Sequence, residues 1–325
     1  MYNDTKVVAI GGGTGLSTML RGLKNYTENL TAIVTVADDG GSSGLLRSDL
    51  GMLPPGDIRN CILALADTEP IMQQLFTYRF PDGALAGHSF GNLFLAAMNG
   101  ICGSFDEAVK KVSDVLAVVG TVLPVTTESV TLSAFLEDGR VIDGESHIGH
   151  RANLEGKVDR VVLKPHMPKP TNGVLRAIEQ AQVIVLGPGS LYTSIIPNLL
   201  VEGVIDAIRT SNAPKIYVCN LMTQMGETEG YTAYDHVAAI EKHSYQGIFD
   251  YVIVNNQQIP ESLKEKYAQE KAEMIHIDAQ NFEGKVKLMQ GNLLLVRDEY
   301  IRHNFSRLAR VIMAIANSGA RYKRG

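Results

Sequence analysis

Short, uninterrupted apolar runs that alternate with helical patterns constrain the fold of this chain most strongly. Each run is rich in β-branched residues on both faces, as expected of a strand that is covered on both sides of a sheet. Because strands alternating with helices imply right-handed crossovers, we predict an α/β fold with a parallel sheet between two helical layers. The predicted strands are Val7–Ile10, Ala32–Val36, Val183–Leu186, Lys215–Val218 and Tyr251–Val254.

Two stretches depart from this alternation. Residues 57–118 are predicted to be helical almost throughout, with prolines and glycines between four helices. Residues 121–164 are predicted to be short strands, and about 45 residues make only a thin independent core. After residue 260 the pattern predicts the helices Ser262–Glu270 and Phe305–Ala316. We therefore expect one domain over 1–325, a β-rich insertion at 121–164 and a C-terminal helical segment at 261–325.

Composition excludes several classes of protein. With 30 Lys and Arg against 35 Asp and Glu, the net charge is −5, so the chain offers no basic surface for nucleic acid. Cys61, Cys102 and Cys219 are too few and too widely spaced for a disulfide framework or a structural zinc site. No apolar stretch approaches the roughly 20 residues that span a bilayer, and the N-terminal apolar run is too short for a signal peptide. We expect a soluble globular protein of a reducing compartment, with no nucleic-acid partner and no membrane insertion.

Glycine and small hydroxyl residues gather in the loops after the predicted strands, where parallel sheets bind ligands. The loop Gly11–Ser17 opens a helix, so its glycines let the backbone approach a ligand and the helix start attracts phosphate. It matches neither GxGxxG nor a Walker loop, and a tight turn without a ligand is the alternative. A second cradle of this kind is Gly187–Ser194. The two loops contribute the candidate ligand residues Gly12, Gly13, Thr14, Gly15, Gly187, Gly189 and Ser190.

Adjacent carboxylates follow the second predicted strand. Two neighbouring acids at a strand end need solvent, hydrogen bonds or a cation, which makes Asp38 and Asp39 candidate magnesium ligands. Asp38 also has a spacing suited to a ribose hydroxyl of a dinucleotide. The glycine–serine run behind them, with Ser42 and Ser43, favours a nest of backbone N–H groups for anionic oxygens. The alternative is an aspartate that caps a turn in a mobile surface loop.

Three further loops supply polar candidates. Asp57 is a candidate helix N-cap, and Arg59, one turn into the same helix, could reach an anion. His88 and Asn92 flank the start of one of the most apolar runs, where a structural role for the histidine is the alternative. Asn220 follows a strand, and an amide in that position suits recognition of a base or a sugar.

Six long motifs occur in the same order as in the YvcK-type gluconeogenesis factor family, which lies within the CofD-like superfamily, and this chain resembles that family. The motifs are GGGTGLSTMLRGLK, TAIVTVADDGGSSG, PPGDIRN, HSFGNLFLAAM, GPGSLYTSIIPNLLV and YVCNLMTQMGETEGYTAYDH, with YIRHN near the end. The resemblance spans Val7 to about Asn304. It implies a Rossmann-like three-layer α/β/α core in a cytoplasmic bacterial protein that normal cell shape and growth on gluconeogenic carbon sources require. It also implies a bound UDP-sugar such as UDP-N-acetylglucosamine, without an established reaction.

The same resemblance extends the candidate site to the C-terminal segment, which would complete it. Tyr267 and Arg302 match family positions associated with UDP-sugar binding. A tyrosine offers a π face to uracil, and an arginine offers a bidentate clamp to a diphosphate. The CofD relatives are transferases that use a divalent metal to move a phospholactyl group from a guanosine-diphosphate donor. This chain shares their glycine-rich loop and paired aspartates but differs through much of its middle, including Gly87–Met98.

Three functions follow from these patterns. The first is a UDP-sugar-binding regulator that contacts a protein partner in cell-wall synthesis, because the phosphate-cradling loops come without an evident nucleophile–base pair. The second is an enzyme, a Mg²⁺-dependent phosphotransferase similar to 2-phospho-L-lactate transferase, with the metal on Asp38 and Asp39. The third is a dinucleotide-binding protein with Asp38 on the ribose of NAD, although no residue marks hydride transfer. A homo-oligomer is the default expectation for such a fold.

Overall fold

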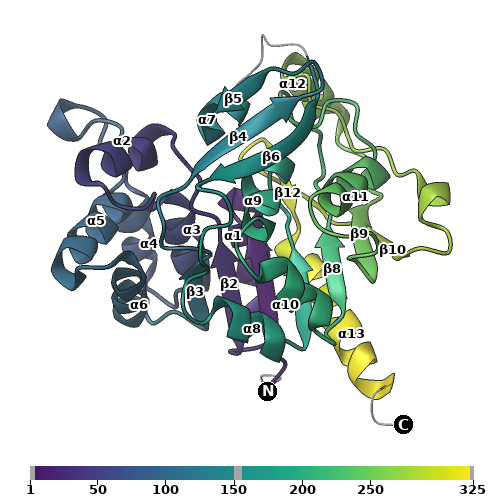
Figure 1. Cartoon of the computed structure of the whole chain (residues 1–325), viewed down its shortest axis with the longest axis horizontal. Coiled ribbons are helices and arrows are strands. Elements are labelled where there is room, and N and C mark those ends of the chain that lie inside the picture. Colours follow the sequence, from purple (N-terminus) through teal and green to yellow (C-terminus); the bar gives the residue numbers. More distant parts are fainter. Residues whose placement is uncertain (1–3, 150–155, 323–325) are drawn as a thin grey trace.

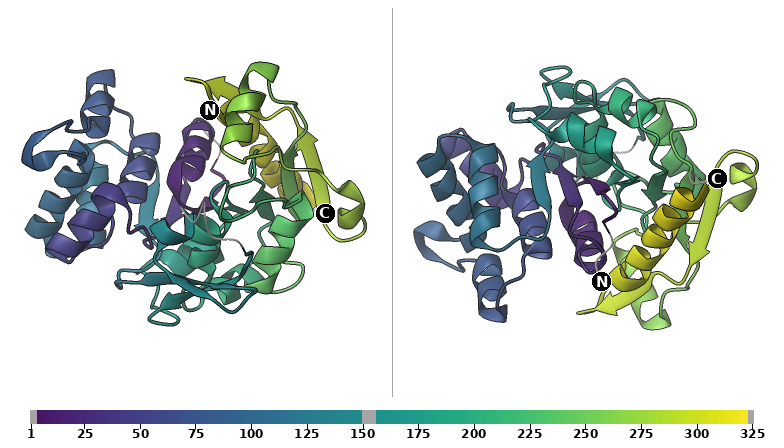
Figure 2. Two further views of the ribbon diagram at one scale, coloured as in Figure 1. Left: turned by 90° about the horizontal axis from the view of Figure 1, so that it is seen from above. Right: turned by 90° about the horizontal axis from the view of Figure 1, so that it is seen from below.

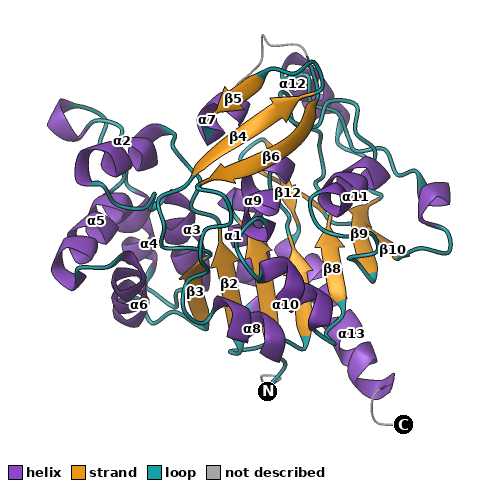
Figure 3. Ribbon diagram, in the orientation of Figure 1, coloured by secondary structure: helices purple, strands orange, loops and turns teal. Residues whose placement is uncertain are grey.

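The computed structural model of the chain describes residues 4–149 and 156–322 and is built around a seven-stranded sheet (Figures 1 and 3). Its strand order is β10-β9-β8-β7-β1-β2-β3, and every neighbouring pair is parallel. This confirms the predicted parallel α/β fold. The strands are β1 (Val7–Gly11), β2 (Leu30–Val34), β3 (Thr121–Pro124), β7 (Val183–Leu186), β8 (Lys215–Val218), β9 (Tyr251–Asn255) and β10 (Lys287–Gly291).

The middle of the sheet is buried on both faces, as its continuous apolar runs require. All residues of β1 and β7 are buried, and Val7 pairs with both Leu30 and Val183. Helices cover both faces of the sheet, which gives the three-layer core (Figure 2). The first face carries α1 (Gly13–Leu23), α13 (Phe305–Tyr322) and α3 (Gly56–Leu65), and the second carries α8 (Val174–Gln180), α9 (Ile196–Leu199), α10 (Val204–Thr210) and α11 (Ala233–Lys242).

A block of helices lies at the β3 end of the sheet (Figure 1). It contains the four helices predicted within 57–118, and a fifth, α2, that was not predicted. The glycine–serine run expected as a nest or mobile loop is the start of α2 instead. Glycine and serine have weak helix propensity, so tertiary packing of the buried Leu46 must stabilise this helix. The block consists of α2 (Gly41–Leu50), α3 (Gly56–Leu65), α4 (Pro70–Thr77), η1 (Gly83–Leu85), α5 (Phe90–Cys102) and α6 (Phe105–Val115).

The expected β-rich insertion is smaller than 121–164. Its first strand, β3, pairs with β2 and so belongs to the main sheet. A separate three-stranded sheet follows, in the order β5-β4-β6, and a short helix after β5 stands where the sequence predicts strand. Residues 150–155 of this stretch lie outside the described residues. The elements are β4 (Thr131–Leu136), β5 (Val141–Asp143), α7 (Glu145–Gly149) and β6 (Val158–Lys164).

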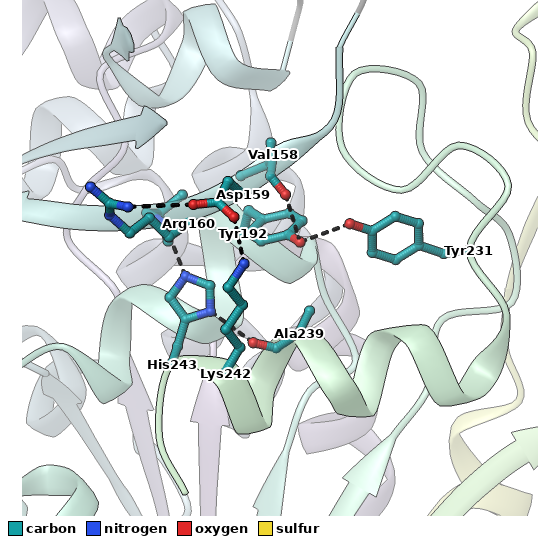
Figure 4. Close-up of polar contacts among 9 residues, drawn as sticks. Val158, Asp159, Arg160, Tyr192, Tyr231, Ala239, Lys242 and His243 are labelled. Atoms are coloured by element: carbon teal, nitrogen blue, oxygen red, sulfur yellow. Dashed lines mark hydrogen bonds and ion pairs between the residues drawn. The ribbon is translucent and has the colours of Figure 1, made fainter. Parts of the chain in front are cut away.

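Hydrogen bonds hold β6 of the insertion to α11 of the core (Figure 4). The Val161 N–H donates to Nε2 of His243 at 2.9 Å, while Nδ1 of the same ring contacts the Ala239 carbonyl at 2.7 Å. Lys242 adds an ion pair of 2.5 Å to Asp159. Because His243 accepts through Nε2, it is held as the neutral tautomer, and burial lowers its pKa. Directional contacts from the C-terminal end of α11 therefore help to fix the insertion to the core, and the Tyr192 hydroxyl adds a hydrogen bond of 3.3 Å to the Val158 carbonyl.

The C-terminal segment at 261–325 was expected to be helical, but its described part also contains three strands. Its strand β10 extends the main sheet, and the antiparallel hairpin β11 (Leu294–Arg297) and β12 (Tyr300–His303) follows. The predicted helix after residue 261 is present as α12 (Glu261–Gln269), and η3 (Ala279–Phe282) precedes β10.

The sequence pattern predicts one helix over Pro197–Arg209, whereas the structure has two in this range, α9 and α10. A π-helical turn, η2 (Leu191–Ile195), leads into α9, and a left-handed Gly203 separates α9 from α10. Across 4–149 and 156–322, no single helix is long and apolar enough to cross a membrane. Only the bent pair Leu191–Leu199 and Val204–Thr210 reaches that length and composition when joined.

Candidate functional site

A cleft of about 660 Å³ opens at the carboxyl ends of the strands. Strand order reverses between β1 and β7, and open α/β sheets bind ligands at such a switch point. The loops after β1, β7 and β8 form the floor, and the C-terminal hairpin forms one wall. Ten sequence-predicted site residues line this cleft: Gly12, Gly13, Thr14, Gly15, Asp38, Gly189, Ser190, Asn220, Tyr267 and Arg302.

The loops after β1 and β7 lie directly against each other. A Cβ atom at Gly15 would stand 2.4 Å from the Pro188 carbonyl oxygen, so only glycine permits this approach. The second loop is also fixed to the third, because Asn220 accepts from the Gly189 N–H at 3.1 Å and donates to its carbonyl at 2.8 Å. Asn220 is therefore placed to hold the loop backbone as well as to line the cleft.

Four described residues with carboxyl groups line the cleft: Asp38, Asp57 and Glu145, and also Glu270 at the end of α12. Asp57 is not the N-cap of α3, which is Pro55; its carboxylate accepts the Gly13 N–H instead. Burial and the neighbouring Asp38 raise the pKa of Asp57 to about 6. Burial, and then the surrounding acids beginning with Asp38, raise the pKa of Glu145 to about 8. The floor of the cleft therefore disfavours further negative charge on its carboxyl side.

Asp57→Asn is expected to stabilise the protein by about 1–2 kcal/mol at pH 8 and by much less at pH 4. Aspartate in the unfolded chain titrates near 3.8, so between that value and about 6 the native state binds more protons. The wild-type protein therefore loses stability as the pH rises from about 3.8 to about 6. The Asp57→Asn variant has no carboxyl group at this position, so its stability does not fall in this window. Urea unfolding of both proteins at the two pH values measures the gap, and an equal gap at both would contradict the assignment.

Asp39 does not share the cleft with Asp38. Its carboxylate accepts the backbone N–H groups of Glu145 at 3.2 Å and Ser146 at 2.8 Å, at the start of α7. Asp38 instead accepts the Gly40 N–H at 2.9 Å. The two aspartates predicted as a magnesium pair therefore have different roles. Asp38 lines the cleft, whereas Asp39 positions the insertion helix that carries Glu145. Within the described ranges, no three His, Cys, Asp or Glu side chains gather in a way that could hold a metal ion.

The other predicted residues outside the cleft connect the helices of the block. Ser42 is hydrogen-bonded to His88 and to Asn92, each at 3.0 Å, which ties α2 to the start of α5. Arg59 donates to Ser89, the N-cap of α5. These side chains therefore connect helices of the block and do not line the cleft. Ser43 likewise accepts the Gly56 N–H at 3.1 Å, and Gly187 has a left-handed φ of 79° behind the cleft loop.

Tyr267 and Arg302 stand on the C-terminal wall. Tyr267 is only 7% exposed, and its hydroxyl accepts the Ile301 N–H at 2.8 Å. The ring is therefore largely packed, and it fixes the strand that presents Arg302. The exposed Arg302 contacts the Ile301 carbonyl at 3.0 Å and lies 5.1 Å from the centroid of Tyr300. We call the buried cluster beneath this wall the C-terminal core; it consists of Leu221, Leu263, Tyr267, Leu294 and Ile301.

Sequence reasoning missed several residues of the site. Glu145 comes from the insertion, and nothing in its local sequence links it to the cleft. Glu227, 4% exposed, accepts the Tyr192 N–H and the Thr193 hydroxyl, both at 3.0 Å, and so holds the turn after the second glycine loop. Gln224 donates to the Ser190 hydroxyl at 2.9 Å. The many polar residues of the loop that contains Gln224 and Glu227 are the sequence feature that could have pointed to these two side chains.

Comparisons with known proteins agree over nearly the whole chain. The family model described as 2-phospho-L-lactate transferase CofD matches residues 7–294. A protein of Thermoanaerobacterium thermosulfurigenes is 58% identical over 96% of this chain and 97% of its own length. The gluconeogenesis factor of Bacillus subtilis is 46% identical over 96% and 98%. A crystal structure of a UPF0052 family member from Bacillus halodurans, 48% identical, has a TM-score of 0.92 and covers 95% of this chain and 99% of that one.

Proposed function

This chain belongs to the gluconeogenesis factor family within the CofD-like proteins, and on that premise we propose that it is a nucleotide-sugar-binding regulatory protein whose ligand is a UDP-sugar. The observation that carries the proposal is the meeting of two glycine loops opposite one exposed arginine across a single cleft. Its volume, about 660 Å³, lies within the range of small-molecule sites.

Each part of the cleft suits one part of such a ligand. Backbone N–H groups at Gly12–Gly15 and the start of α1 favour a diphosphate, and Arg302 supplies a positive charge from the opposite wall. Asp38 and Asn220 could form hydrogen bonds with the hydroxyl and amide groups of the ribose or the sugar. The carboxyl groups repel phosphate, so we expect the diphosphate on the glycine-loop side and the hydroxyl-rich groups on the carboxyl side.

Regulation requires that the ligand favour one arrangement of the protein over another. Equal affinity for two arrangements shifts nothing. The ligand would touch both the sheet loops and the hairpin with Arg302, and so would favour the arrangement in which these two parts are close. We propose that this state is what a protein partner in cell-wall synthesis reads, and that the chain thereby supports cell shape and growth on gluconeogenic carbon sources.

Isothermal titration calorimetry with UDP-N-acetylglucosamine, UDP-glucose, UDP and NAD tests the ligand. We expect saturable binding of at least one UDP-sugar, weaker binding of UDP alone, and displacement of NAD by the UDP-sugar. Inorganic phosphate is the control for a non-specific anion. Failure of every UDP-sugar to bind, or tighter binding of NAD, would overturn the proposal.

A phosphotransferase is the second candidate, because the family model that matches residues 7–294 describes a transferase. The described residues do not offer a ready metal set, since Asp39 is engaged by α7, and we derive no step through a metal. Phosphorus NMR of a UDP-sugar incubated with the protein and Mg²⁺ separates the two functions. New phosphorus signals that depend on the protein would favour the transferase.

A further inference from the structure

One side of the cleft carries three carboxyl groups among polar neighbours. We call Asp38, Asp57 and Glu145 the acid side; they come from the loop after β2, the first turn of α3 and the start of α7. The acid side adjoins the first glycine loop, because a Cβ atom at Gly12 would stand 2.7 Å from the Asp57 carboxylate. The same Cβ atom would also meet two hydroxyl residues that line the cleft, Thr35 and Ser194. This side therefore suits a group rich in hydroxyls.

The C-terminal wall provides an apolar side. Its apolar cleft residues belong to the C-terminal core or pack against it: Leu221, Met222, Tyr267, Ala272 and Ile301. Met222 and Ala272 are partly exposed and so present apolar surface to the cleft. The wall adjoins the second glycine loop, because Asn220, which precedes the core residue at 221, is bonded to the Gly189 backbone. Apolar side chains of this kind cover the flat faces of a nucleobase.

Within the acid side, Glu145 has the carboxyl group that is left for a ligand. Asp38 accepts the Gly40 N–H, and Asp57 accepts the Gly13 N–H. Across residues 4–149 and 156–322, no hydrogen bond or ion pair engages the Glu145 side chain. Because burial and the surrounding acids raise its pKa to about 8, this carboxyl group is largely protonated at neutral pH. A protonated carboxyl group both donates and accepts hydrogen bonds, as sugar hydroxyls do.

The insertion holds Glu145 in a fixed position relative to the glycine loops. Asp39 accepts the backbone N–H groups of Glu145 and Ser146, at 3.2 and 2.8 Å. Helix α7 also contacts η2, the turn that follows the second glycine loop. The carboxyl group is thus placed before a ligand arrives, which lowers the entropic cost of binding.

We propose that a nucleotide-sugar lies across the cleft with its nucleoside against the C-terminal wall and its sugar on the acid side, where Glu145 recognises the sugar hydroxyls. The inference rests on the proposed function. A nucleotide-sugar has two unlike groups joined by one diphosphate, and the cleft has two unlike sides joined by its glycine loops. The reverse orientation would place the carbonyl oxygens of uracil, which only accept hydrogen bonds, beside aspartates that also only accept. It would also leave sugar hydroxyls against apolar side chains.

Calorimetric titration of the full chain with UDP and with UDP-glucose separates the two ends of the ligand. EDTA in the buffer prevents a divalent cation from bridging the ligand and the carboxyl groups. Glu145→Ala should weaken UDP-glucose binding about tenfold, the effect of losing one or two hydrogen bonds, and change UDP binding by less than about twofold. Glu137→Ala is the matched control, because Glu137 is an exposed acid of the same insertion outside the cleft. It should change neither affinity.

Two more variants keep the test decisive. Glu145→Leu has a similar volume but forms no hydrogen bond, and it should show the same difference if Glu145→Ala folds poorly. Met222→Ala on the C-terminal wall should weaken UDP and UDP-glucose by similar factors, because both ligands contain the uridine. Equal losses of the two ligands in the Glu145 variants, unchanged affinities there, or a Met222→Ala loss confined to UDP-glucose would overturn the orientation alone. Failure of the wild type to bind either ligand would overturn the proposed function as well.

Discussion

Arg302→Ala is expected to weaken UDP-sugar binding by about 100-fold and to leave folding unchanged. A charge-assisted, bidentate contact to a phosphate contributes about 3 kcal/mol, which corresponds to that factor in Kd. Arg302 is exposed, and among the described residues its contacts are the neighbouring Ile301 carbonyl and the Tyr300 ring. Its loss should therefore reach the ligand without disturbing the hairpin. Calorimetric titration gives the affinity, and thermal unfolding gives the stability.

Arg297→Ala is the matched control for this loss of charge. Arg297 lies on β11 of the same hairpin, is exposed and pairs with Asp298 at 3.6 Å, but it does not line the cleft. Its substitution should change the affinity by less than about twofold. Similar losses from both variants would mean that general positive charge, and not the clamp at Arg302, attracts the ligand.

Gly15→Ala is expected to abolish measurable UDP-sugar binding and to destabilise the protein by about 1–3 kcal/mol. The new methyl group would lie 2.4 Å from the Pro188 carbonyl oxygen and 3.1 Å from the Gly189 nitrogen, both of which are backbone atoms. No side-chain rotation can relieve this overlap, so the two glycine loops must move apart. Because both loops contribute to the proposed phosphate cradle, even a small separation removes its geometry.

Gly149→Ala provides the comparison for Gly15→Ala. A Cβ atom at Gly149 would meet nothing within 4 Å, and this glycine is outside the cleft. Affinity should stay at the wild-type level. Urea denaturation and titration of both variants separate the general effect of an added methyl group from its effect between the loops. Wild-type affinity in a folded Gly15→Ala protein would show that the loops do not grip the ligand together.

The sequence predicted the inner strands well and the outer ones poorly. β7 and β8 match their predicted bounds, and β1 extends one residue further, because buried parallel strands are continuous apolar runs. β2 begins two residues before the predicted Ala32, since strand ends depend on pairing with β1. β10 is largely polar and exposed, so its pattern carries no signal of burial. Only pairing with β9 makes it a strand.

In the candidate site too, features set by the local sequence were predictable, and features set by contacts with distant residues were not. The glycine loops were predictable because a run of glycines indicates a tight turn or a close backbone approach, which depends on the local sequence alone. The different tasks of Asp38 and Asp39 were not, since adjacent residues in an extended segment point in opposite directions. Asp39 contacts an insertion that begins nearly a hundred residues later. For Tyr267, the family resemblance suggested an open stacking surface, whereas the structure packs most of the ring and binds its hydroxyl to β12.

The C-terminal core has a consequence for how the molecule moves. Five buried residues support the wall with Tyr267, whereas the main sheet rests on a far larger cluster. The free energy of local opening increases with the amount of buried apolar contact, so this wall should open before the main sheet does. Its amide hydrogens would then exchange with solvent soonest. A ligand that contacted both this wall and the loops of the main sheet would stabilise the closed arrangement and slow that exchange.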